Sequence, residues 1–176
     1  MPNFSTINPF KFPAQNVTVC VQDQTLNGYK IMDKKKKIVL YNVVGKSSPL
    51  GDKFQISRAN DGVLLGSIQQ SKKEAKYRLM GTHDQELAII KIIDHKIQLK
   101  IANTTYEGDS KNRNKIIEFF DSESKLILTI DKKVLSLNDE YVISHIEQFP
   151  TLIAQMSAIV IDSYFHFGPD ETKLSL

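Results

Sequence analysis

The stretch that decides the fold is Glu147-Gln-Phe-Pro-Thr-Leu-Ile-Ala-Gln-Met-Ser-Ala-Ile-Val-Ile-Asp-Ser-Tyr-Phe-His-Phe167. It predicts a helix from Pro150 to Phe167, because proline suits a first helical position and Gly168-Pro169 can end a helix. Apolar side chains cover most of its circumference at 100° per residue. The narrow remainder consists of Gln155, Ala158 and Asp162. A helix with so little polar surface is expected inside a core.

A membrane span is the alternative interpretation of this stretch. Such a span needs about 20 predominantly apolar residues. Five polar residues interrupt the stretch, namely Gln155, Ser157, Asp162, Ser163 and His166. The pattern therefore favours a buried helix.

The chain before this helix alternates apolar and polar residues with a period of two, which is typical of half-buried strands. Val17, Val19 and Val21 begin the pattern. About twelve short strands follow from it: 17–22, 29–32, 37–44, 53–57, 63–69, 76–80, 87–93, 96–101, 104–107, 115–120, 126–133 and 140–144. We interpret 108–114 as a polar loop. The fold class is therefore mainly β with one C-terminal helix.

A size argument favours a closed, mostly antiparallel barrel with the helix inside. Eight strands enclose a bore that their own side chains fill, and the bore widens with strand number. About twelve strands would leave a lumen, and a helix about 10 Å across can fill it. A two-sheet sandwich with the helix outside is the alternative. We expect one domain at 16–168, preceded by an N-terminal arm at 1–15 and followed by a tail at 169–176.

A faint internal repeat supports a duplicated sheet. The segment 46–56 aligns without gaps on 133–143, and the two share Leu50/Leu137, Asp52/Asp139, Phe54/Tyr141 and Ile56/Ile143. Each copy reads as a loop, a turn and the start of a strand. The alternative explanation is that any two segments with a polar turn before a strand look somewhat alike.

These hairpins, the Leu-Gly-Asp-Lys-Phe and Leu-Asn-Asp-Glu-Tyr strand starts and the terminal helix resemble the tubby C-terminal-like superfamily, over roughly 37–167. The resemblance is greatest to the LURP-one-related and small bacterial branch, with phospholipid scramblases as cousins. It implies a barrel of about twelve strands around a buried helix. It also implies membrane association, since tubby proteins bind phosphoinositides through basic residues of the barrel wall. Lipid scrambling is not expected, because the chain lacks a cysteine-rich segment and an acidic calcium loop.

Composition narrows the function classes. The net charge of +3 is too small for a typical nucleic-acid binder, so no nucleic-acid partner is expected. Cys20 is the one cysteine, and no secretory signal is evident, which predicts a cytoplasmic, reducing location. We expect a monomer.

No motif predicts an enzyme, a metal site or a cofactor. Gly45-Lys46-Ser47 does not extend to a phosphate loop, because Leu40 stands where that motif needs glycine. The four histidines lie in separate segments without zinc-site spacing: His83, His95, His145 and His166. No nucleophile elbow is present.

Basic clusters carry the functional hypothesis. The predicted lipid-binding residues are Lys34, Lys35, Lys36, Lys37, Lys72, Lys73, Lys76 and Arg78. Several basic side chains near one anionic membrane surface can recruit a protein, at roughly 1 kcal/mol each. The prediction is a non-enzymatic module that binds anionic lipids or phosphoinositides peripherally. The alternatives are a protein-interaction scaffold without lipid binding, an enzyme whose active site shows no motif, and lysines that only solubilise loops and strand edges.

Overall fold

The computed structural model describes residues 16–23, 26–46, 53–71, 73–133 and 139–165. The predicted arm at 1–15 and tail at 169–176 lie outside the described residues. So does Lys72, one of the predicted lipid-binding residues.

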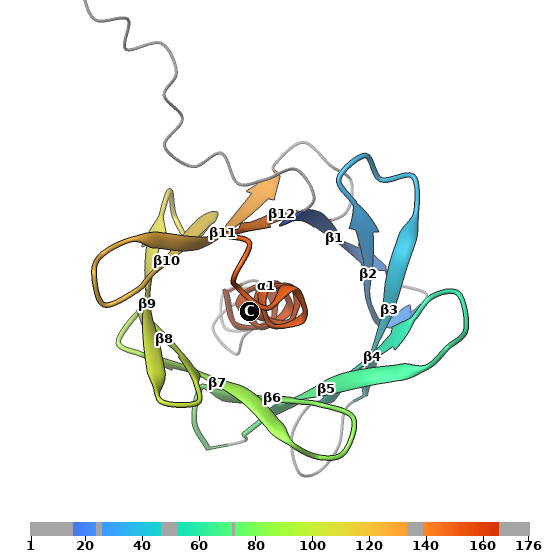
Figure 1. The fold of residues 1–176 in the computed structure, drawn as a ribbon, viewed down its shortest axis with the longest axis horizontal. Helices are drawn as coiled ribbons and strands as arrows, with labels where there is room; N and C mark the ends of the chain where they lie inside the picture. The colour runs from blue at the N-terminus through green and yellow to red at the C-terminus, as the bar shows by residue number, and fades with distance from the viewer. Residues whose placement is uncertain (1–15, 24–25, 47–52, 72, 134–138, 166–176) are drawn as a thin grey trace, which may run out of the picture.

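Twelve antiparallel strands form one closed barrel (Figure 1). Their bounds are β1 Val17–Asp23, β2 Gly28–Asp33, β3 Val39–Lys46, β4 Lys53–Arg58, β5 Leu64–Gln70, β6 Lys76–Met80, β7 Glu86–Ile93, β8 Lys96–Ile101, β9 Thr104–Lys111, β10 Ile116–Phe120, β11 Leu126–Lys133 and β12 Glu140–His145. Each strand pairs with its neighbours in sequence, and β1 pairs with β12 to close the sheet, from Val17 opposite Ser144 to Val21 opposite Glu140. The predicted barrel is confirmed, and the sandwich alternative is wrong.

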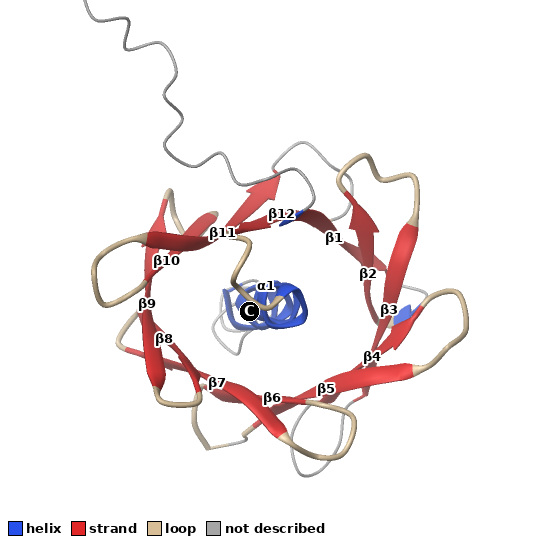
Figure 2. Cartoon of the chain, viewed as in Figure 1, coloured by secondary structure: helices blue, strands red, loops and turns tan. Residues whose placement is uncertain are grey.

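The single helix of the described chain, α1 (Thr151–Phe165), lies inside the barrel (Figure 2). It begins one residue after the predicted Pro150, and the expected last turn at 166–167 lies outside the described residues. Ten consecutive residues of α1, from Ile153 to Asp162, are buried. No helix among the described residues is long and apolar enough to cross a membrane.

Alternation along the strands supplies the lining for this helix. On β8, Ile97 and Leu99 are completely buried, whereas Lys96, Gln98 and Lys100 are exposed. Because successive side chains of a strand point to opposite faces, the same residue pattern fills the lumen and solvates the outer wall. The core is therefore one continuous layer between the sheet and α1.

The predicted loop at 108–114 is wrong in its first half, because β9 continues to Lys111. Backbone pairing with β10 extends the strand, with Ser110 opposite Ile117. Gly108 allows the passage: a Cβ there would lie 2.8 Å from the Ile97 Cβ and 2.9 Å from the Phe119 ring. The second half of β9 is therefore a strand because its backbone pairs with β10 and because Gly108 has no side chain, although its residues do not alternate between apolar and polar.

The up-and-down order sends successive connections to alternate ends of the barrel. We call the end at which α1 begins the proximal end. It carries the connections after even-numbered strands, including β2–β3 and β4–β5. The distal end carries the connections after odd-numbered strands, including β5–β6 and β7–β8.

Candidate anion-binding surfaces

The fold separates the predicted lipid-binding residues into two groups. Lys34, Lys35, Lys36 and Lys37 are exposed in the β2–β3 connection at the proximal end. Lys73 is exposed in the β5–β6 connection at the distal end, and β6 carries Lys76 and Arg78. The structure therefore keeps Lys76 and Arg78 together and places the Lys34–Lys37 run at the other end of the barrel.

Strand register adds three lysines to the β6 pair. Lys76 lies directly opposite Lys91 of β7. Arg78 of β6 and both Lys96 and Lys100 of β8 occupy diagonal positions around Lys91. Directly opposite residues have Cβ atoms about 5 Å apart, and diagonal neighbours are about 7–8 Å apart. We call Lys91 and the four cations around it on the outer face the basic wall.

Acidic partners are scarce at the basic wall. Arg78 Nε donates to Glu86 at 2.9 Å, and no ion pair among the described residues involves the four lysines of the wall. Glu107 accepts instead from the Gln98 amide, at 3.4 Å. Like charges directly opposite each other destabilise a sheet. Register also places Glu107 diagonal to both Lys96 and Lys100, so five cations stand with two acids, Glu86 and Glu107, and the wall keeps an excess of positive charge.

Other lysines of the barrel show the usual arrangement. Lys30 lies 2.8 Å from Asp23, and Lys111 lies 2.8 Å from Glu118. The second pair raises the pKa of Lys111, because its ammonium donates a hydrogen bond to the Glu118 carboxylate. These outward-facing lysines each have an acid within reach.

Sequence reasoning missed Lys91, Lys96 and Lys100. The alternation of 96–101 puts Lys96, Gln98 and Lys100 on one face of the strand, but it does not show which neighbours they meet. The missing signal was register, since only the pairing of β6 with β7 and of β7 with β8 gathers side chains up to 24 positions apart.

The lysine-rich connection at the proximal end is ordered by an aspartate. One carboxylate oxygen of Asp33 accepts hydrogen bonds from the backbone N–H groups of Lys37 and Ile38, both at 2.7 Å. These bonds, the Ile38 bond foremost, hold the pKa of Asp33 below its usual value. Lys36 Nζ lies 3.1 Å from Glu140. Lys34, Lys35 and Lys37 take part in none of the ion pairs between described residues.

The buried polar chemistry lies inside the barrel, away from these surfaces. Asp162 of α1 is completely buried, and its two oxygens accept from the hydroxyls of Tyr29 and Tyr141, each at 2.5 Å. Burial raises the pKa of Asp162 and also raises the pKa of the nearby Cys20 thiol. Both groups therefore favour their neutral forms. The cluster anchors the helix to β2 and β12.

The described histidines do not converge. His83 and His95 are exposed in separate turns, and His145 is buried with its Nδ1 2.7 Å from the Ile146 carbonyl oxygen. The described part of the chain contains no group of three or more His, Cys, Asp or Glu residues arranged to hold a metal ion. His166 lies outside that part.

Comparisons with known proteins give a structural likeness without a family. No protein-family profile and no curated protein sequence matches the chain. The X-ray structure of the Arabidopsis thaliana protein AT5G01750 is similar, with a TM-score of 0.58 over 86% of this chain and 93% of that one. Sequence identity is 12%, so the likeness concerns the fold.

Proposed function

We propose that this protein is a non-enzymatic module of the tubby-like type that binds anionic lipid headgroups, of the phosphoinositide class, through the basic wall. One observation carries the proposal: Lys91 has Lys76 directly opposite and three further cations on its diagonals, with one acid, Glu86, paired to the group. An anion that bears several phosphates would relieve this repulsion. The proposed setting is the cytoplasmic face of a membrane, with the protein bound peripherally as a monomer.

The geometry suits a phosphorylated headgroup. The five side chains arise from three adjacent strands, so the register sets the spacing of their Cα atoms, and the flexible lysine side chains can adjust to a ligand. Lysine ammonium groups act as point charges toward phosphate, and the guanidinium of Arg78 can donate two parallel hydrogen bonds. The resemblance to tubby proteins supports this choice, because it implies phosphoinositide binding on the barrel wall.

Charge reversal tests the proposal. The double variant Lys91→Glu, Lys100→Glu should lose sedimentation with phosphatidylcholine vesicles that contain a phosphoinositide, and added salt should weaken binding of the wild type. The matched control is Lys46→Glu, Lys125→Glu, which changes the net charge equally at exposed positions outside the wall. The control should bind as the wild type does. Equal loss in both double variants would show that only net charge matters and would overturn the site.

A protein-interaction scaffold is the second candidate. Three exposed aliphatic side chains at the proximal end, Ile38, Val63 and Leu64, favour it, because exposed apolar groups are available to a protein partner. A wild type that ignores anionic vesicles at low salt would leave this candidate in place of the lipid module.

A further inference from the structure

Exposed aliphatic residues concentrate at the proximal end. Four large hydrophobic side chains are exposed in the described part of the chain, and three of them are Ile38 at 61%, Val63 at 48% and Leu64 at 42%. Ile38 lies in the β2–β3 connection, and Val63 and Leu64 lie where β5 begins. The fourth, Ile93, is at the distal end of β7.

The two hairpins that carry these residues are neighbours. The Ala59 N–H, just after β4, donates to the Leu40 carbonyl oxygen at 3.0 Å, which ties the β4–β5 connection to the start of β3. Leu64 in turn pairs with Ser57 of β4. The three aliphatic residues therefore belong to adjacent stretches of the same barrel end.

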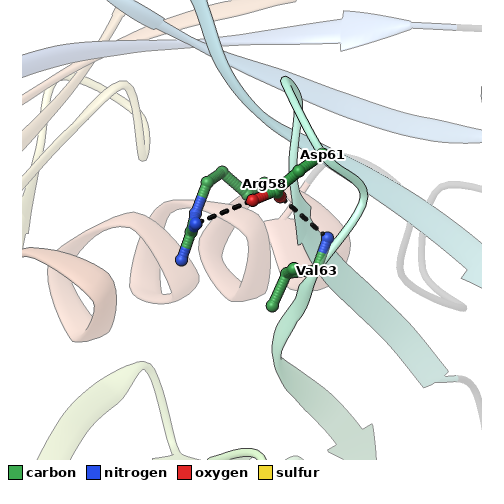
Figure 3. A network of polar contacts seen from close by, with 3 residues as sticks. All are labelled: Arg58, Asp61 and Val63. Carbon is green, nitrogen blue, oxygen red and sulfur yellow. Dashed lines mark hydrogen bonds and ion pairs between the residues drawn. The ribbon is translucent and has the colours of Figure 1, made fainter.

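An aspartate stiffens each hairpin. Asp33 accepts from two backbone N–H groups next to Ile38, as described above. Asp61 plays the same part beside Val63: one of its oxygens accepts from the Val63 N–H at 3.0 Å, and the other accepts from Arg58 Nη1 at 2.8 Å (Figure 3). In each hairpin an aspartate therefore fixes the backbone beside the exposed aliphatic side chains.

Lysines outnumber acids beside these residues, because four lysines follow Asp33 in the β2–β3 connection. Lys34, Lys35 and Lys37 stand next to Ile38 without an ion pair among the described residues, whereas Arg58 is neutralised by Asp61. We name these three lysines, together with Ile38, Val63 and Leu64, the proximal rim. Aliphatic tips flanked by lysines match an anionic bilayer, which offers an acyl layer beneath negative headgroups. Protein hot spots instead favour Trp, Tyr and Arg, and the rim has none of these.

We propose that the proximal rim enters an anionic bilayer and that, with the basic wall, it lets one molecule bridge two membranes. This inference rests on the proposed lipid binding of the wall. The two surfaces face different ways: the connections β2–β3 and β4–β5 lie on the right of Figure 1, whereas β7 and β8 lie at its lower left. A flat bilayer that lies against the outer face of β6–β8 therefore does not reach the rim.

Vesicle clustering tests the bridge. The wild type, mixed with vesicles of phosphatidylcholine, phosphatidylserine and a phosphoinositide, should increase their hydrodynamic size several-fold in light scattering. The triple variant Ile38→Ser, Val63→Ser, Leu64→Ser keeps every charge of the rim. It should still sediment with the vesicles through the wall but should no longer cluster them. The control Ile93→Ser removes the exposed aliphatic residue outside the rim and should cluster them like the wild type.

The outcomes separate the two proposals. A wild type that binds without clustering overturns the bridge, leaves the wall intact and assigns the rim to a protein partner. A triple variant that clusters as well as the wild type also overturns the bridge. Loss of all sedimentation in the triple variant would make the rim the lipid surface and overturn the wall. Sedimentation equilibrium of the free protein should show a monomer, since a dimer with one lipid surface per copy would cluster vesicles without a rim.

Discussion

The ionisable side chains on the inner and the outer face of the barrel have different kinds of neighbour. Inside, Asp162 is the one fully buried acid of the described residues, and two tyrosine hydroxyls satisfy it. Outside, Lys91 faces Lys76 with two more lysines and an arginine around it. Burial makes the carboxyl of Asp162 depend on hydrogen-bond partners, because an unpaired buried polar group is costly. Water screens the repulsion among the outer lysines, so an excess of positive charge can persist there and can bind an anionic ligand.

The largest expected effect comes from placing a second acid inside. Ile159→Asp would bury a second carboxylate at a completely buried position of α1, three residues before Asp162. We expect a loss of several kcal/mol, enough to unfold a marginally stable domain. Circular dichroism during heating measures it. A variant that melts cooperatively near the wild-type temperature would show that the helix does not need an apolar lumen.

Removing the satisfied acid should cost less. Asp162→Ala leaves the hydroxyls of Tyr29 and Tyr141 without this acceptor in a buried site. An unsatisfied buried polar group costs about 1–3 kcal/mol, so chemical denaturation should show a loss in that range. Asp162→Asn, which keeps an acceptor oxygen, serves as the control and should recover part of it. Equal stability of the wild type and Asp162→Ala would mean that the cluster does not anchor the helix.

The same carboxyl predicts a smaller, pH-dependent effect. Folding raises the pKa of Asp162 above its unfolded value of 3.8, because burial disfavours the charged form. The folded chain therefore keeps this proton where the unfolded chain has lost it. The stability that the neutral acid contributes is full below pH 3.8 and falls as the pH rises through the folded pKa. The free energy of unfolding should be measured against pH for the wild type and for Asp162→Asn, and the difference between the two curves gives the contribution of the Asp162 carboxyl. A difference that rises with pH would contradict a raised pKa for Asp162.

The smallest effect should come from the outer face, and it should have the opposite sign. Lys91→Thr removes the like-charge contact with Lys76 and places a good strand former on β7. We expect a gain of roughly 0.2–1 kcal/mol in the free energy of unfolding. The same substitution should weaken vesicle binding. A variant that is both less stable and equally bound would remove the argument that the cluster exists for a ligand.

These contrasts also show how far the sequence could lead. Two features predicted the closed barrel: the apolar side chains around most of the helix circumference and the number of strands. Both follow from local periodicity in the sequence. The polar strip of α1 was visible as Gln155, Ala158 and Asp162, but its meeting with Tyr29 and Tyr141 depends on how the helix sits in the lumen.

Local sequence patterns also could not predict which charged surface residues lie close together. Runs such as Lys34–Lys37 are evident in the sequence, and they led to a predicted site that the fold divides between two ends. The basic wall has no run at all, since its five cations come from three strands. Register decides such a site, and register depends on bulges and turn lengths along the whole hairpin series.

The most direct test of the basic wall is a titration of ¹⁵N-labelled protein with a soluble inositol trisphosphate, followed by NMR. The probe carries the headgroup chemistry without a bilayer, so the rim cannot contribute through its aliphatic residues. Our account predicts saturable shifts centred on the amides of Lys76, Arg78, Lys91 and Lys100, and their absence in Lys91→Glu, Lys100→Glu. Shifts centred on the Lys34–Lys37 connection, or no shifts at low salt, would contradict it.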